Sequence, residues 1–143
     1  MTQDGKTLTE LLVVVGIVAI VASMALPNFM TLNSRTQLRC AAEEIASELR
    51  LAKQLALTNR DRVRILVDLD RRELVTQFVL SGLTHHVYHY SDKHLVIEEP
   101  SAGPEILFHP SGRSATATTV QLRSQEGQSQ KLTVSITGRV SIL

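Results

Sequence analysis

Four histidines lie within ten residues of one another, and imidazole is a common zinc ligand. They are His85, His86, His89 and His94. On a β-strand His85 and His89 would share one face, so that a nearby carboxylate could complete a metal site. No cysteine and no second tightly spaced pair of ligands accompanies them. Solvated strand and turn residues are therefore the favoured interpretation, and no metal or other cofactor is predicted.

The sequence lacks the residue patterns of an enzyme. Ser34, Ser111 and the histidines form no nucleophile motif, and no glycine-rich phosphate-binding loop occurs. The single cysteine, Cys40, excludes an intrachain disulfide. The net charge of +1 is typical neither of a basic nucleic-acid binder nor of an acidic tail. We therefore expect a structural or binding protein rather than an enzyme.

Basic residues gather in two places. Arg60, Arg62 and Arg64 alternate along an expected strand, where a solvated face is the simplest interpretation and an interface with a subunit or an anion is the alternative. From Ile106 onward the sequence has four basic residues and a single acid, Glu126, which would favour contact with phosphate. These basic residues are Arg113, Arg123, Lys131 and Arg139.

An apolar run without charge occupies residues 11–26, with Glu10 at its entrance and Pro27 at its exit. As a helix it would span about 24 Å, and its flanks would extend it toward the ~30 Å of a bilayer core. A buried helix is disfavoured because so small a domain could not surround a segment that is apolar on every side. A cleaved secretory signal and a retained membrane helix are the other interpretations, and the helical pattern beyond Pro27 favours the retained helix.

Beyond Pro27 the pattern is that of an amphipathic helix. Apolar residues recur at steps of four and three, and no glycine or proline interrupts residues 28–58. The apolar positions are Leu38, Ala42, Ile45, Leu49, Ala52 and Ala56. We expect one long helix over about 7–58, apolar all round in its first half and amphipathic in its second. Pro27 should bend or loosen it, because proline removes a backbone hydrogen bond.

After the helix the apolar period changes to two, which is typical of strands. Val63, Ile65, Val67 and Leu69 fall on one expected face. About seven short strands joined by tight turns favour antiparallel pairing. The expected fold class is therefore α+β, with a long N-terminal helix packed on antiparallel β-sheet.

The start of the chain resembles the class III signal of type IV pilins and type II secretion pseudopilins. Gly5 is followed by four residues, by Glu10 and by the apolar run, with Pro27 at the matching distance. The resemblance implies that a prepilin peptidase cuts after Gly5 and methylates the new amino terminus at Lys6. The family usually has phenylalanine there and a positively charged leader, whereas the leader of this chain, residues 1–5, has no lysine or arginine.

The remainder resembles the branch of pseudopilin H and the minor pilins T and U. The resemblance rests on "RTQLRCAAEEIASELRLAKQLALTNRDRVRI", "FHPSGR" and "VSITGRVSI". It implies a leader at 1–5, a transmembrane helix at 6–27, its amphipathic continuation at 28–58 and a periplasmic β-rich domain at 59–143.

The implied protein is a minor pilin-like subunit of a type II secretion system or a type IV pilus, which share this signal and fold. It would be anchored in the inner membrane by a single pass and would join, or initiate, a periplasm-spanning filament. The implied partners are other pilin or pseudopilin subunits, the prepilin peptidase, the inner-membrane assembly platform and membrane lipid.

Glu10 has a physical reason to need a partner. A carboxylate near the membrane is costly unless it is paired, and its own helix offers Val14 instead of a cation four residues on. In the resembling family the partner is the amino terminus of the next subunit, so the pair would fix the register of assembly. The alternative is that Glu10 stays in water at headgroup level, where the helix N-terminus favours a carboxylate.

Two other functions stay open. One is a DNA-binding minor pilin for natural transformation, but the family motif G-R-x-R is met only by Gly138 and Arg139, because Ser141 replaces the second arginine. The other is a membrane-anchored domain that joins no filament. A secretion or pilus subunit is the preferred prediction.

Overall fold

The computed structural model describes residues 7–93 and 95–143, without the side chains of 25–31. Gly5, Lys6 and His94 lie outside the described residues. The chain divides into two compact units, Met1–Arg35 and Thr36–Leu143. The predicted segment boundaries after residues 27 and 58 stay predictions.

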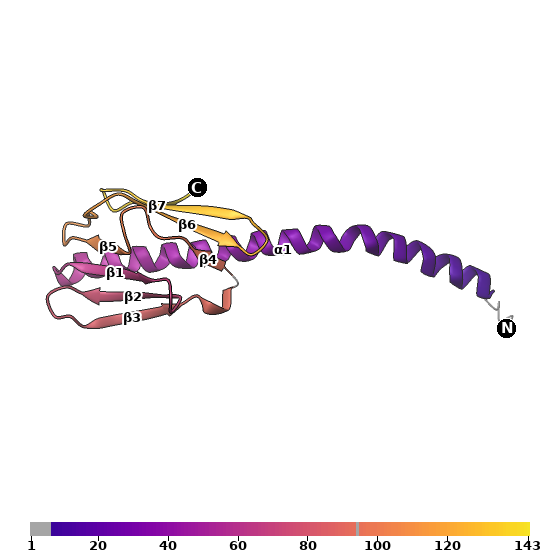
Figure 1. Ribbon diagram of the computed structural model, residues 1–143, viewed down its shortest axis with the longest axis horizontal. Coiled ribbons are helices and arrows are strands. Elements are labelled where there is room, and N and C mark those ends of the chain that lie inside the picture. Colours follow the sequence, from indigo (N-terminus) through magenta and orange to yellow (C-terminus); the bar gives the residue numbers. More distant parts are fainter. Residues whose placement is uncertain (1–6, 94) are drawn as a thin grey trace. The chain divides into compact units, whose positions relative to one another are not determined.

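One helix, α1, runs over Leu8–Asn59 and agrees with the predicted helix to within one residue at each end (Figure 1). It begins after Thr7, whose side-chain oxygen accepts a hydrogen bond from the amide of Glu10 at 3.3 Å, as an N-cap residue does. It ends where Arg60 takes a positive φ of 52°, a conformation that interrupts helical hydrogen bonding. The backbone is helical through Pro27, and the predicted effect of this residue on the helix stays a prediction.

The unit Thr36–Leu143, called the globular unit below, holds two four-stranded sheets. All paired strands are antiparallel, as predicted. The first sheet has the order β3-β2-β1-β5 and the second β4-β6-β7-β8. A 3-10 turn, η1 (Ser91–Lys93), precedes β4. The strands are β1 (Val63–Asp68), β2 (Glu73–Phe78), β3 (Thr84–His89), β4 (Leu95–Ile97), β5 (Glu105–Phe108), β6 (Thr118–Ser124), β7 (Ser129–Val134) and β8 (Val140–Ile142).

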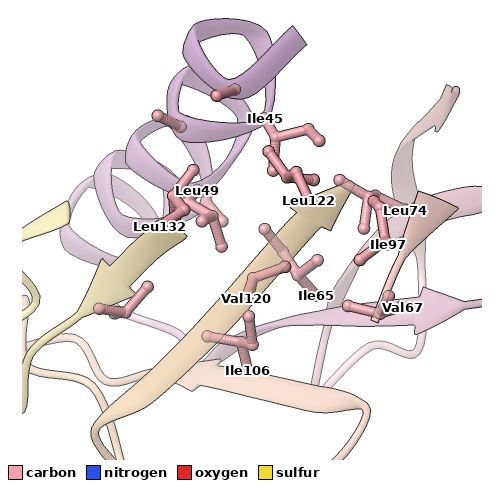
Figure 2. Packing of buried hydrophobic residues seen from close by; sticks show 14 of the residues in the cluster. Ile45, Leu49, Ile65, Val67, Leu74, Ile97, Ile106, Val120, Leu122 and Leu132 are labelled. Carbon is pink, nitrogen blue, oxygen red and sulfur yellow. The ribbon is translucent and has the colours of Figure 1, made fainter. Parts of the chain in front are cut away.

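We call the residues of α1 up to Arg35 its first part and those from Thr36 its second part. The core lies between the second part of α1 and the two sheets. In the view of Figure 1, β1, β2 and β3 lie below this part of the helix and β6 and β7 above it. Every residue of the predicted apolar stripe, from Leu38 to Ala56, is buried. Figure 2 shows Ile45 and Leu49 of the helix among core residues of the sheets, including Leu122 and Leu132. The amphipathic half of the helix therefore finds its apolar partner within its own chain.

The predicted apolar face of β1 is only partly correct. Val63, Ile65 and Val67 are buried, whereas Leu69 is half-exposed and lies in the turn after the strand. The Asp68 carboxylate accepts hydrogen bonds from the amides of Asp70 and Arg71 at 3.0 and 2.9 Å. These bonds form a local turn, which ends the strand before Leu69 can join the core.

Candidate functional site

The N-terminus of α1 presents Glu10 in the first helical turn. The Thr7 carbonyl accepts hydrogen bonds from the amides of Glu10 and Leu11 at 2.9 and 3.2 Å. With the Thr7 side chain as cap, Glu10 is the third helical residue, a position where acidic side chains are favoured. No basic side chain of the described residues lies within ion-pair distance of Glu10. The helix N-terminus therefore favours the negative charge of Glu10, but no cation among the described residues pairs with it.

The apolar side chains that follow Glu10 are exposed around the whole helix. Of the large ones between Leu11 and Met24, even Val14, the least exposed, keeps 51% of its surface accessible. Within the described residues, no helix has both the length and the apolarity that crossing a membrane requires. The predicted span at 6–27 includes residues that are not described, and it stays a prediction.

The basic residues of the C-terminal third fall into two groups. Arg123 on β6 and Lys131 on β7 are exposed strand residues, opposite Ser129 and Gln121 respectively. Arg123 forms an ion pair with Glu98 at 3.3 Å, so its charge is already compensated. The structure does not gather the four predicted residues on one strand face, because Arg113 and Arg139 belong to two loops.

Those two loops meet at a pair of glycines. Gly112 and Gly138 both have positive φ, +79° and +72°, which favours glycine. A side-chain carbon added at Gly138 would stand 2.0 Å from the Gly112 carbonyl oxygen, so nothing larger fits without a shift. Lys53 of α1 donates a hydrogen bond from Nζ to the Gly138 carbonyl at 3.0 Å. The late "FHPSGR" and "TGRV" motifs of the sequence thus form one contact.

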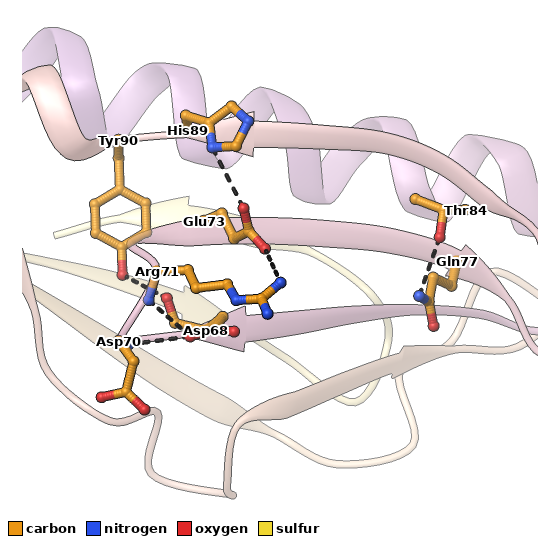
Figure 3. Close-up of polar contacts among 8 residues, drawn as sticks. All are labelled: Asp68, Asp70, Arg71, Glu73, Gln77, Thr84, His89 and Tyr90. Atoms are coloured by element: carbon orange, nitrogen blue, oxygen red, sulfur yellow. Dashed lines mark hydrogen bonds and ion pairs between the residues drawn. The ribbon is translucent and has the colours of Figure 1, made fainter.

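The histidines of β3 have separate partners and do not converge. His85 packs edge-on against Phe78, with ring centroids 5.9 Å apart. His86 Nδ1 lies 3.3 Å from Glu48, and His89 Nδ1 lies 3.4 Å from Glu73. In Figure 3 Glu73 stands between His89 and Arg71.

A β-bulge in β3 interrupts the alternation that would place His85 and His89 on one face of the strand. The register of β2 and β3 shifts so that Thr76 pairs with His86 but Gln77 pairs with Thr84. His85 is the extra residue, and the bulge interrupts the alternation on which the expectation rests. Among the described residues, no group of three histidine, cysteine or carboxylate side chains is arranged to hold a metal ion.

The arginines around the start of β1 also separate. Arg60 and Arg62 are exposed and precede the strand, so only Arg64 lies on it. Arg64 donates hydrogen bonds to the Gln77 side-chain oxygen at 3.1 and 3.3 Å and lies 4.0 Å from Glu105. Its side chain therefore links the three neighbouring strands β2, β1 and β5 across the surface of their sheet.

A polar cluster on the second part of α1 was not anticipated from the sequence. Tyr88 of β3 donates a hydrogen bond to Glu44 at 2.5 Å, and Lys93 Nζ lies 2.9 Å from the same carboxylate oxygen. The hydrogen bond from Tyr88, and then that from Lys93, lowers the pKa of Glu44. Burial, and then the hydrogen bond to Glu44, raises the pKa of Tyr88. Glu44 thereby connects the helix to β3 and η1.

The packing of one long helix against two antiparallel sheets is that of pilin-like α+β proteins. The type IV minor pilin FimU of Pseudomonas aeruginosa matches with a TM-score of 0.66 and 20% identity, over 76% of this chain and 90% of its own. The minor pseudopilin EpsH of the Vibrio cholerae type II secretion system matches with a TM-score of 0.63 and 15% identity, over 75% and 96%. These structural similarities identify the fold as pilin-like α+β.

The family follows from the sequence itself. The family model described as "Type II transport protein GspH" matches residues 41–138, and the chain belongs to this family. It is a minor pilin-like subunit of a type II secretion system or type IV pilus. Comparison with curated protein sequences found no match. The DNA-binding alternative finds no support in these comparisons.

Proposed function

We propose that the chain is made as a precursor, is cut by a prepilin peptidase after Gly5, and is methylated on the new amino terminus at Lys6. Its apolar segment then anchors it in the inner membrane, with the β-rich domain in the periplasm. From there the assembly platform adds it to a filament of other pilin or pseudopilin subunits, or starts such a filament with it. Glu10 pairs with the amino terminus of the neighbouring subunit and fixes the register.

The exposure of the apolar side chains between Leu11 and Met24 is the observation that carries the proposal. Full burial of one valine, leucine or isoleucine side chain is worth about 1.5–3 kcal/mol. A helix surface of this kind is therefore expected to be covered, first by lipid and then by the helices of neighbouring subunits. Such packing is weakly directional, so a charged contact is needed to select one stagger among many.

Glu10 is suited to that contact. Its helix cap places the carboxylate in the first turn, and no basic side chain of the described residues compensates it. A methylated amine at Lys6 of another subunit keeps its positive charge and supplies the missing cation. The pair forms only when two subunits are correctly staggered, and an incorrect stagger leaves a carboxylate in an apolar interface.

The test of pairing is Glu10→Gln, which keeps the size of the side chain and removes its charge. We expect this variant to lose co-purification with other pilin-like subunits from membranes, while the β-rich domain keeps its unfolding transition. Glu43→Gln is the matched control, because Glu43 is an exposed glutamate of the same helix in the globular unit. Normal yield of complexes from Glu10→Gln would refute the pairing, whereas a wild-type chain that co-purifies with no other pilin-like subunit would favour a membrane-anchored domain without a filament.

Processing is tested by intact-mass measurement of the membrane-extracted protein. We expect a chain that begins at methylated Lys6, and we expect Gly5→Ala to leave the precursor uncut but inserted. Gly16→Ala is the control, because a side chain at Gly16 would meet nothing within 4 Å. A mature chain that begins at Leu26 would instead indicate an ordinary secretory signal.

Experiments in cells are needed to distinguish a type II secretion system from a type IV pilus. Deletion of the gene should abolish enzyme export if the filament belongs to a type II secretion system, and twitching motility if it belongs to a type IV pilus. Loss of DNA uptake alone would favour the transformation alternative.

A further inference from the structure

We propose that the contact between the loop at 109–113 and the turn at 135–139 is a binding site for an acidic side chain of a neighbouring pilin-class subunit. The inference rests on the proposed function, since it names a second place where such a subunit is held. We call this region the glycine junction, after Gly112 and Gly138 at its centre.

Backbone hydrogen bonds hold both segments of the glycine junction in shape. The His109 amide donates to the Arg113 carbonyl and the Ser135 amide to the Arg139 carbonyl, at 2.8 and 2.9 Å. A third bond, from the Ser114 amide to the Ile136 carbonyl at 3.0 Å, ties one segment to the other. The junction is therefore formed before any partner arrives, and little conformational entropy is lost on binding.

Three basic residues from three separate segments belong to the glycine junction or contact it. Lys53 reaches it from α1 through its hydrogen bond to the Gly138 carbonyl, and Arg113 and Arg139 directly follow the two glycines. Both arginine side chains are exposed. No carboxylate of the described residues lies within ion-pair distance of any of the three. The junction therefore carries a positive charge that the described part of the chain does not neutralise.

A surface pocket of about 330 Å³ lies on the glycine junction. It is lined by His109, Ser111, Arg113, Ser114, Ala115 and Ile136. Arg113 is among the lining residues, and a guanidinium can hold a carboxylate through two hydrogen bonds. Ile136 also lines the pocket and is 49% exposed. A glutamate or aspartate fits this mixture, because its methylene groups can pack on Ile136 while its carboxylate meets Arg113.

The same observations favour an acidic protein segment over nucleic acid. DNA binding requires many cations along one track, since each phosphate adds only a small increment. The structure separates Arg123 and Lys131, on the strands, from the loops of the glycine junction, and Arg123 is already paired with Glu98. A compact cationic site beside an exposed isoleucine resembles a protein interface, where arginine and apolar side chains are enriched together.

The test is site-specific photocrosslinking in cells that make the full-length chain. A photoreactive amino acid replaces Ser111, which is exposed at the pocket, and mass spectrometry identifies the crosslinked peptide. We expect a peptide with an acidic residue from another pilin-like subunit.

Arg113→Glu should lower the crosslink yield about tenfold, as expected for a close charge pair. Lys131→Glu, with the same charge change on an exposed strand residue, should leave the yield unchanged. Exchange of the identified acid for arginine should restore crosslinking to Arg113→Glu.

Each other result overturns the proposal in a recognisable way. Equal yields from Arg113→Glu and Lys131→Glu would exclude a specific acid site. Crosslinks to DNA, lost steeply with salt, would assign the junction to nucleic acid. If Ser111 gives no crosslink although the chain co-purifies with other subunits through Glu10, this site fails and the proposed function stands. If the wild-type chain co-purifies with no pilin-like subunit, the proposed function fails, and the partner named here fails with it.

Discussion

The two parts of α1 are built from similar apolar residues but differ in where their partners come from. Leu12, in the first part, is 66% exposed, whereas Leu49, in the second part, is 1% exposed. Two β-sheets of the same chain cover the second part. No described element buries the apolar side chains of the first part, and in the proposed function lipid and neighbouring subunits supply their contacts. One helix would then serve both as part of a domain core and as the proposed assembly surface.

The glutamates of the helix repeat this contrast. Glu44, in the second part, is bound by Tyr88 and Lys93. Glu10, in the first part, has no basic partner among the described residues. The charge of Glu44 should therefore act on the stability of the fold, whereas the charge of Glu10 should act on association. Substitutions matched between the two parts can separate these effects.

The largest effect is expected from removing a leucine in each part. Leu49→Ala should lower the free energy of unfolding of the globular unit by about 2–5 kcal/mol, because it removes buried methyl groups and leaves a cavity. Leu12→Ala should change it by less than about 0.5 kcal/mol, because Leu12 is not buried by the chain. Denaturant unfolding of the full-length chain in detergent, followed by circular dichroism, measures both. Equal losses would contradict the contrast between the two parts.

The glycine junction is a close backbone contact within the globular unit. A methyl group added there should therefore also lower the free energy of unfolding. Gly138→Ala meets the Gly112 carbonyl oxygen at 2.0 Å, whereas Gly127→Ala, also at a positive φ, meets nothing within 4 Å. The backbone strain common to both is about 1–2 kcal/mol. Overpacking should add about 1–3 kcal/mol for Gly138→Ala alone. The same unfolding measurement compares the two, and an equal cost would show that the loops separate easily.

A smaller effect is expected from the two glutamates. Glu44→Gln should lower the free energy of unfolding by about 1 kcal/mol, a reduced value for a charged hydrogen bond because the side chain is 42% exposed. Glu10→Gln should leave the unfolding of the globular unit unchanged. If both variants unfold alike, Glu44 contributes no more to the fold than Glu10 does.

The Glu44 cluster also predicts how stability depends on pH. The pKa of Glu44 is lowered from its ordinary value of 4.5, so its contribution is present above about pH 4.5 and is lost as the pH falls further. The pKa of Tyr88 is raised from its ordinary value of 10.0, so stability should fall again as the pH rises above 10. Tyr88→Phe should flatten both limbs of a plot of unfolding free energy against pH. Unchanged limbs would show that Glu44 and Tyr88 do not control them.

Local patterns in the sequence predicted much of this fold. The stripe from Leu38 to Ala56 depends only on helical period, and the buried face of β1 only on strand period, so both could be inferred from neighbouring residues. The position of Glu10 at the helix start followed in the same way. Contacts between distant segments could not be inferred. Glycine is a residue type common in turns, but nothing in the sequence around Gly112 and Gly138 shows that their backbones meet.

The remaining differences have the same origin. Leu69 fitted the strand pattern, but the turn bonded to Asp68 ended the strand first. His85 and His89 fitted a two-residue period that a bulge interrupts. Glu44 lies outside the predicted apolar stripe, and its partner Tyr88 comes from a strand 44 residues away in the chain. Such features depend on strand register and tertiary packing, which a single sequence does not encode in neighbouring positions.

The smallest effect extends the comparison to the basic residues outside the helix. Arg123 has a partner in its own chain, Glu98, whereas Arg113 has none among the described residues. Arg123→Ala should lower the free energy of unfolding by about 0.2–1 kcal/mol, because both side chains of the pair are largely exposed. This loss should shrink at high salt, which screens exposed pairs. Arg113→Ala should leave stability unchanged at every salt concentration, because its charge stabilises no contact within the described residues. Denaturant unfolding at low and high salt compares the two variants. A salt-sensitive loss in Arg113→Ala would mean that the chain itself supplies an acid for Arg113, and it would remove the reason to look for that acid on a neighbouring subunit.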